Sequence, residues 1–436
     1  MSSQISHRHI WRLAWPMILG NLSVPILGIV DTAILGHLDQ PIYLAAVALG
    51  ASIITFVFWA FGFLRMGTTS FVAQAHGAGN QDRYQQVVGQ SIFLALSIAL
   101  LVLVVHRPLL DVIFWAMKAE ASLVDLATEY TRIRILGAPA VMVNYVIIGI
   151  FIGLQKTRIP LLLALVVNGI NIVLDYVLII LLEMNSQGAA LATVIADYSV
   201  LILGLWFLSK HFTLGYLVTG WRNLIQWQSL KDLVQVNRHL FVRTASLLFV
   251  FLFIAAQGAK QGEVILAANA ILLQLLSLAA YGMDGFAHAT ETLVGHSVGK
   301  RSSQTFWSAC RRASLWSLIT ALFITAIFVL FKPLIVSVFT DIESVRDATL
   351  RFYPWLIVLP LISVWSYQLD GIFIGMGESK ALQWGMLFSL LCIFLPVWYF
   401  TTSLANHGLW MAFVLFNAMR GVSLAWMLWR LRKRFD

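Results

Sequence analysis

The chain has 436 residues, of which 60% are hydrophobic and 11% are charged. Soluble domains carry about 25% charged residues, so this composition excludes an ordinary soluble protein and predicts an integral membrane protein. The formal net charge of +9 does not require a nucleic-acid partner, because Lys and Arg collect in the cytoplasmic loops of membrane proteins.

Twelve apolar stretches are each long enough to cross a bilayer, which takes about 20 residues of α-helix. In chain order they are residues 10–36, 42–74, 84–106, 121–153, 159–182, 187–209, 232–257, 263–295, 305–331, 347–376, 380–402 and 407–431. Because several are longer than one crossing needs, we expect tilted helices or helices that extend beyond the bilayer. The sequence therefore predicts an all-α integral membrane protein with 12 transmembrane helices.

The first of these spans contains two prolines, Pro16 and Pro25, and one carboxylate, Asp31. Each proline removes a helical hydrogen bond and crowds the carbonyl four residues earlier, so both are candidate bend points. A charged residue near the membrane centre costs about 2.5–3.5 kcal/mol on insertion scales. A helix that can bend and carries such a group predicts a switch driven by a proton or an ion. The alternative is a kinked helix whose Asp31 only hydrogen-bonds to its neighbours.

Further polar residues lie on single faces of the fifth and sixth spans. Asn171 and Asp175 are four residues apart in the fifth span, and Thr193 and Asp197 are four residues apart in the sixth. These groups and Asp31 can share one level of the membrane. Because burial favours the protonated form of a carboxyl group, the cluster could hold a proton near neutral pH or, when ionised, coordinate Na⁺. The alternative is a satisfied polar network that only fixes helix packing.

Short segments recur in the two halves of the chain. Gly-Ile-Phe-Ile-Gly occurs at 149–153 and at 371–375, and His-Gly-Ala-Gly at 76–79 has a counterpart in His-Ser-Val-Gly at 296–299. The matches keep their order at nearly one offset, and each half holds six spans, so both halves enter the membrane from the same side. We therefore predict two parallel six-helix lobes related by an axis along the membrane normal, as in some alternating-access transporters.

The predicted division of the chain is an N-terminal lobe at 1–208, a linker at 209–231 and a C-terminal lobe at 232–436. More Lys and Arg lie in the flanks and loops on the side of the N-terminus than on the opposite side, with Arg243 assigned to those flanks. The excess of positive charge predicts that both termini and the linker are cytoplasmic.

The C-terminal half has its own intramembrane polar residues. They are Gln274, Ser277, Tyr281, Asp284, His288 and Glu291 along one face of the eighth span, and Tyr367 and Asp370 in the tenth. Ionisable residues along one intramembrane face are typical of a wet cavity, so this stripe predicts a second ion site or a site for a cationic substrate. A structural network is the alternative. The spacing of Asp284, His288 and Glu291 differs from HExxH, and we expect no metal site.

The chain resembles the MATE (multidrug and toxic compound extrusion) family, and most closely its bacterial DinF-like branch. The resemblance covers essentially the whole chain and depends on the twelve spans in two halves together with several short segments. These segments are Pro16 and residues 30–37 in the first span, Asn171 and Asp175 in the fifth, residues 187–193 at the start of the sixth, and residues 370–375 in the tenth.

The resemblance implies a secondary antiporter that expels organic, often cationic, compounds against an inward flow of H⁺ or Na⁺. It implies that Asp31, Asn171, Asp175 and Thr193 form the cation or proton network of the N-terminal lobe, and that Pro16 is the hinge of the first span. Other branches of the family are thought to bind the cation in the C-terminal lobe, a possibility that the C-terminal stripe leaves open. For the substrate cavity we find only Asn144 and Tyr145 as contributors from the fourth span.

We therefore predict a multidrug efflux antiporter of the bacterial inner membrane. It is expected to be a lipid-embedded monomer that is not an enzyme, couples to H⁺ and uses no other cofactor. One alternative is Na⁺ coupling through the same residues. Another is a lipid-linked oligosaccharide flippase of the same superfamily, which would need a basic cavity, whereas the intramembrane charges read as mostly acidic. A third is a membrane enzyme built on Asp284, His288 and Glu291.

Overall fold

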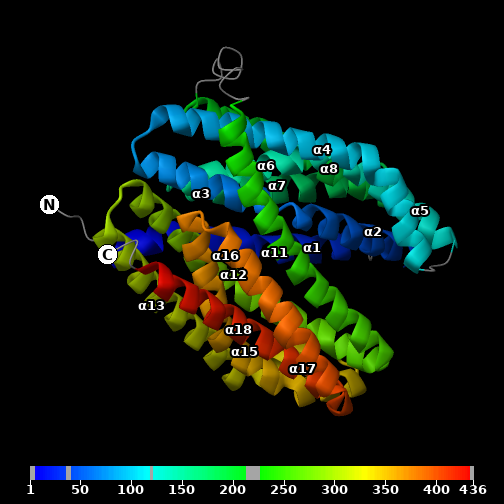
Figure 1. Cartoon of the computed structure of the whole chain (residues 1–436). Helices are drawn as coiled ribbons and strands as arrows, with labels where there is room; N and C mark the ends of the chain where they lie inside the picture. Colours follow the sequence, from blue (N-terminus) through cyan, green and yellow to red (C-terminus); the bar gives the residue numbers. More distant parts are fainter. Residues whose placement is uncertain (1–4, 36–40, 118–120, 213–225, 433–436) are drawn as a thin grey trace. The chain divides into compact units, whose positions relative to one another are not determined.

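The computed structural model describes residues 5–35, 41–117, 121–212 and 226–432, so the central part of the predicted linker at 209–231 lies outside it. Every regular element in these ranges is a helix (Figure 1). The architecture confirms the predicted all-α fold class.

The helices follow one another with short connections. In the first half they are α1 (His7–Leu35), α2 (Pro41–Ala60), α3 (Phe63–Gly77), α4 (Gln81–Met117), α5 (Ala121–Ile135), α6 (Ala138–Gly153), α7 (Arg158–Asp175), the π-helix η1 (Tyr176–Leu181) and α8 (Asn185–Ser209). In the second half they are α11 (Trp227–Lys260), α12 (Glu263–Gly299), α13 (Ser303–Leu330), α14 (Lys332–Phe339), α15 (Glu343–Met376), α16 (Ser379–Phe388), the π-helix η2 (Ser389–Phe394), α17 (Leu395–Phe400), the 3₁₀-helix η3 (Thr402–Leu404) and α18 (Asn406–Leu431).

The helices agree with the predicted spans. Within the described residues, ten are long and apolar enough to cross a membrane, and α5 with α6, bent by 50°, makes an eleventh. The remaining span, predicted at 10–36, corresponds to α1, which runs as one helix through Pro16 and Pro25. The predicted span at 42–74 is divided into α2 and α3.

The chain folds into two compact units. We call residues 1–21, 73–79 and 235–436 the C-terminal unit, and residues 22–72 and 80–234 the N-terminal unit. Helix α1 therefore begins in the C-terminal unit and ends in the N-terminal unit, and the last turn and a half of α3 belong to the C-terminal unit.

Glycine contacts repeat between the two halves of the sequence. A Cβ atom added at Gly149 of α6 would lie 2.6 Å from the carbonyl oxygen of Arg65 in α3, and one added at Gly371 of α15 would lie 2.5 Å from the carbonyl oxygen of Ala287 in α12. In the sequence, Gly371 follows Gly149 by the same number of positions as Ala287 follows Arg65. Only glycine allows helices to approach so closely, so the recurring Gly-Ile-Phe-Ile-Gly segment marks equivalent helix crossings.

A reciprocal glycine contact joins α3 and α12 inside the C-terminal unit. A Cβ atom added at Gly77 would collide with the backbone of His296, and one added at Gly299 would collide with the backbone of Gln74. Each glycine thus packs on the equivalent turn of the other helix, which is the contact expected across a two-fold axis. The crossing supports the predicted parallel repeat.

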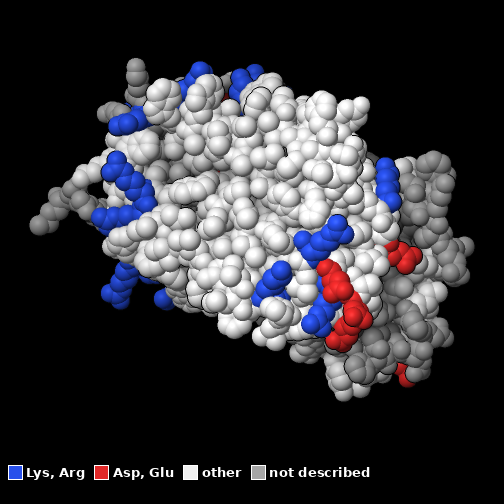
Figure 2. All heavy atoms as spheres, turned by 90° about the horizontal axis from the view of Figure 1, so that it is seen from below, with Lys and Arg blue, Asp and Glu red and all other residues white. Residues whose placement is uncertain are grey.

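Much of the surface carries no charged side chains, as the face drawn in Figure 2 shows. Exposed apolar side chains such as Leu322 and Phe323 of α13, at 52% and 65%, face outward. In water such a surface would be costly, whereas in a bilayer it is the expected contact with lipid.

Candidate functional site

A cavity of about 190 Å³ lies inside the N-terminal unit. Most of its wall is apolar and comes from α2, η1 and α8, and its polar groups are Tyr130, Asp175 and Thr193. Gly28 of α1 completes the lining. The volume has room for several water molecules, and the three polar groups supply hydrogen-bond partners for them, so Asp175 borders a space that can hold water.

Two residues of α7 form the centre of this site. Asn171 and Asp175 are exposed by only 0% and 2%, and their spacing of four places both side chains on one face of the helix. Asp175 is the last residue of α7, and the π-helix η1 begins directly after it. Single turns of π-helix occur frequently at functional sites.

The Asn171 amide joins Asp175 to helix α8. Its nitrogen donates to Asp175 Oδ2 at 3.2 Å, and its oxygen accepts from the backbone N–H of Thr193 at 3.3 Å. The Thr193 hydroxyl donates to the carbonyl of Ala189 at 2.9 Å. The bond from Asn171 suits an ionised Asp175, because a carboxylate only accepts hydrogen bonds, whereas a protonated carboxyl group also carries a donor.

Helix α1 is connected to this site. The Asn168 side chain of α7 donates to the backbone carbonyl of Ser23 in α1 at 3.1 Å, and Gly28 lines the cavity. Asp31 lies on α1 one turn beyond Gly28, but its side chain lies outside the described residues, so its place in the network stays a prediction.

Asp197 belongs to a different cluster of the N-terminal unit. It forms an ion pair with Arg134 at 3.1 Å, and the two side chains are exposed by only 15% and 11%. The Asn144 amide donates to the backbone carbonyl of Asp197 at 3.1 Å, and Tyr145 lies within electrostatic reach of its carboxylate. The structure thus brings Asp197 together with the two predicted cavity residues of α6. None of these four residues lines the cavity at Asp175.

The predicted polar stripe on α12 runs from the surface into the C-terminal unit. Gln274 is exposed, Tyr281 and Asp284 are half-buried and interact electrostatically, and Glu291 is buried. His288 Nδ1 lies 3.5 Å from Glu291 Oε2. The stripe therefore combines accessible and buried groups along one helix.

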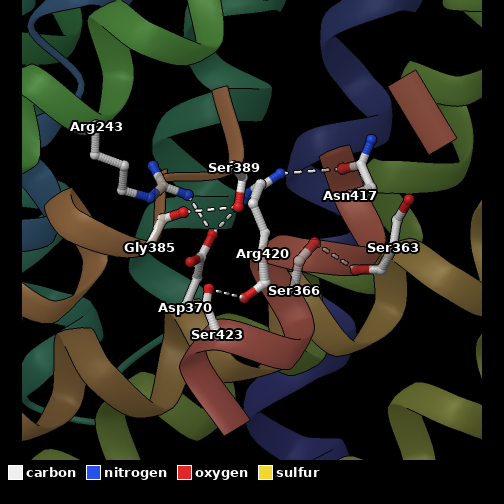
Figure 3. A network of polar contacts seen from close by, with 9 residues as sticks. All are labelled: Arg243, Ser363, Ser366, Asp370, Gly385, Ser389, Asn417, Arg420 and Ser423. Carbon is white, nitrogen blue, oxygen red and sulfur yellow. Dashed lines mark hydrogen bonds and ion pairs between the residues drawn. The ribbon is translucent and has the colours of Figure 1, made fainter. Parts of the chain in front are cut away.

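Asp370 of α15 lies in a network that the sequence did not predict (Figure 3). Its Oδ2 atom accepts hydrogen bonds from Arg243 of α11 and from Arg420 of α18, the latter at 2.8 Å. Arg420 also donates to Asn417 Oδ1 at 3.1 Å. Tyr367 lies within electrostatic reach of Asp370 and of both arginines.

Three arginines are buried in the two units, and the sequence analysis assigned one of them to the wrong place. Arg243 was assigned to a cytoplasmic flank although the predicted span at 232–257 contains it, and it is 6% exposed. Arg420 inside the span at 407–431 and Arg134 in α5 are 2% and 9% exposed. Buried arginines therefore accompany the intramembrane carboxylates, which the sequence analysis did not predict. The signal in the sequence that could have revealed the buried arginines is an arginine within an otherwise apolar span.

Comparison with known proteins identifies the family. The family model for MatE matches residues 16–177 and 240–400, which is most of the chain. The chain belongs to the MatE (MATE) family. Like other MATE proteins it is a transporter and not an enzyme, so the alternative of a membrane enzyme on the α12 stripe is set aside.

Relatives of this MATE protein cover nearly its whole length. It is 38% identical to the DNA damage-inducible protein F of Escherichia coli over 98% of this chain and 92% of that protein. It is 23% identical to the multidrug resistance protein NorM of Vibrio cholerae over 98% of this chain and 95% of that protein. The first of these relatives agrees with the DinF-like branch.

Solved structures show the same fold. An outward-facing multidrug resistance MATE transporter of the MOP superfamily superimposes with a TM-score of 0.89 at 24% identity, covering 99% of this chain and 96% of that chain. A MOP superfamily transporter from Pyrococcus furiosus gives 0.88 at 25% identity, covering 98% and 96%. The MATE fold is therefore established for this chain, which is a membrane-spanning efflux transporter of drugs or toxic compounds.

Proposed function

We propose that this transporter couples export of small organic compounds to inward H⁺ flow through Asp175 and Asp31. The observation that supports this most is the hydrogen bond from the Asn171 amide to Asp175 Oδ2, because the oxygen of the same amide contacts Thr193 of α8. This bond needs an accepting oxygen, so gain or loss of one proton at Asp175 would change a contact that joins α7 to α8. The adjoining cavity gives the proton a water-accessible route to the carboxylate.

Helix α1 is the proposed link between protonation and movement. Its first part packs tightly in the C-terminal unit, where the Ala14 carbonyl and the Ile18 side chain lie against Gly285 of α12. Its later part is held to α7 through Ser23 and Asn168. Protonation of Asp31 and Asp175 would rearrange the second attachment. Bending near Pro16 would then change the affinity of the drug site.

The proposed setting is the inner membrane of a bacterium, with a lipid-embedded monomer whose termini are cytoplasmic. The excess of Lys and Arg in the flanks and loops on the side of the N-terminus supports this orientation, because positive residues collect on the cytoplasmic side. The proposed substrates are small organic drugs or toxins, many of them cationic. Neither a metal ion nor a nucleic acid is required.

Sodium coupling is the second candidate. The cavity at Asp175 also offers the Thr193 hydroxyl as an oxygen ligand, and oxygen ligands suit a hard cation. In this case Na⁺ would bind the ionised carboxylate, and the Asn171 amide would keep its hydrogen bond to Asp175.

Gradient-driven flux in vesicles tests the proposal. The protein is reconstituted in Na⁺-free buffer with tetramethylrhodamine methyl ester, a fluorescent cation, and a pH gradient is imposed. We expect dye flux in the natural protein and its loss in Asp31→Asn and in Asp175→Asn at equal protein levels. Asp341→Asn, which changes an exposed carboxylate outside the helices, is the matched control and should transport normally.

Each other outcome contradicts the proton proposal in its own way. Full flux in both variants would move coupling away from the N-terminal unit. Flux that starts only when a Na⁺ gradient is added would establish sodium antiport. No flux under either gradient would favour the flippase alternative.

A further inference from the structure

Three membrane-spanning helices bring two arginines to one carboxylate in the C-terminal unit. Arg243, Asp370 and Arg420 are exposed by only 6%, 5% and 2%. Figure 3 shows both guanidinium groups pointing at the Asp370 carboxylate. Buried charges are expensive in a membrane protein and mark sites of function more often than packing.

The two guanidinium groups have more donors than the cluster has acceptors. Each arginine carries five N–H donors. The side-chain hydrogen bonds found for them go to Asp370 Oδ2, from both arginines, and to Asn417 Oδ1. The Nε atoms of Arg243 and Arg420 are buried without a hydrogen-bond partner among the residues that the structure describes. A buried donor without a partner is costly, so the cluster is built to accept more negative charge than Asp370 supplies.

The cluster borders less buried polar groups. Tyr367 and Asp284 are half-buried, and Tyr367 lies within electrostatic reach of Asp284, Asp370 and both arginines. A small molecule that reaches Tyr367 therefore meets a positive pair of guanidinium groups and, close by, a separate carboxylate. This arrangement suits a zwitterion as well as an acid.

We propose that Arg243 and Arg420 form an anion-accepting subsite that binds the carboxylate group of transported compounds. The planar fork of arginine matches a carboxylate in two-pronged geometry. Asp370 holds the arginines in place and competes with the incoming carboxylate for their donors. The inference rests on the proposed export of small organic compounds and adds carboxylate-bearing compounds, zwitterions included, to the substrate class.

Two matched dyes test the subsite. Tetramethylrhodamine carries a free carboxylate, and its methyl ester lacks that charge but is otherwise the same molecule. Binding of each dye to the purified protein in nanodiscs is measured by fluorescence polarisation, with no gradient. We expect Arg420→Gln and Arg243→Gln to weaken binding of the acid by roughly tenfold or more, as the loss of a charge-assisted hydrogen bond predicts. The ester should bind these variants within about twofold of the natural protein.

Asp370→Asn separates recognition from a structural role. If Asp370 competes with the ligand, removing its charge should tighten binding of the acid by several-fold and leave the ester unchanged. A network that only supports the fold predicts the opposite sign, weaker binding of both dyes in all three variants. Arg420→Lys keeps the positive charge without the fork and should retain part of the preference for the acid.

The outcomes separate this inference from the proposed function. Equal binding of both dyes to the natural protein, or weakening of both alike in the arginine variants, overturns the anion subsite and leaves proton-driven flux of the ester untouched. Conversely, a preference for the acid that disappears in Arg420→Gln supports the subsite even if no proton-driven flux is found.

Discussion

Asn171 lies one helical turn before Asp175, and its amide nitrogen donates to Oδ2 of Asp175 at 3.2 Å. This hydrogen bond suits the ionised form of the carboxyl group. The amide oxygen accepts from the backbone N–H of Thr193 in α8. A change in the protonation of Asp175 on α7 would therefore change a contact with the neighbouring helix α8.

Replacing Asn171 should uncouple protonation from transport. Asn171→Ala removes the hydrogen bonds of the amide to Asp175 and Thr193 while keeping Asp175, so we expect proton-driven dye flux to fall by roughly tenfold or more, since two buried hydrogen bonds are lost. Flux in vesicles measures this, and Gln274→Ala, at an exposed polar position in α12, is the control. Normal flux in Asn171→Ala would show that the amide does not transmit the protonation state.

Asn168→Ala should affect movement without affecting the proton site. The variant loses only the hydrogen bond from α7 to the Ser23 carbonyl of α1. We expect the purified protein still to exchange protons on dye addition but to show a smaller change in tryptophan fluorescence, because Trp11 and Trp15 lie on α1. An unchanged fluorescence response would mean that this hydrogen bond does not transmit a change at the proton site to α1.

The ion pair of Arg134 with Asp197 should act mainly on stability. Removing one partner of a buried pair leaves an uncompensated charge, which costs about 3–5 kcal/mol. Asp197→Asn should therefore lower the midpoint of thermal unfolding, and the double variant Arg134→Gln with Asp197→Asn should recover much of it and still transport. A stable Asp197→Asn protein without proton-driven flux would instead place Asp197 in the coupling network, as first predicted from the sequence.

The glycine crossings should respond alike in the two halves. Gly149→Ala and Gly371→Ala each force a methyl group against a backbone carbonyl, so both should lower the unfolding midpoint. Gly169→Ala in α7 has nothing within 4 Å of the added atom and should be neutral or stabilising by about 1 kcal/mol, the helix propensity of Ala over Gly. A large difference between the two crossing variants would argue against equivalent packing.

The sequence predicted the helices better than the sites. Apolar length locates spans because the bilayer sets a minimum, and the repeated Gly-Ile-Phe-Ile-Gly segment showed where helices cross closely. Side-chain partners on different helices leave no mark in sequence spacing. Helical periodicity placed Asp197 beside Thr193 on α8, yet its partner is Arg134 of α5.

The same limit explains why the sequence did not predict the network at Asp370. Its partners Arg243 and Arg420 come from helices far apart in the chain, α11 and α18. The count of positive residues assigned Arg243 to a cytoplasmic flank, because most arginines of membrane proteins lie in loops or flanks. Asn171 and Asp175 were found because both lie on one helix face, where spacing alone predicts contact.

Proton release from the purified protein tests the central claim most directly. Tetramethylrhodamine methyl ester is added to the protein in weakly buffered, Na⁺-free detergent solution, and the pH change is recorded with an indicator. The account predicts that dye binding releases protons from the natural protein and from Asp341→Asn, and releases none from the double variant Asp31→Asn with Asp175→Asn. Undiminished proton release from the double variant would contradict the account.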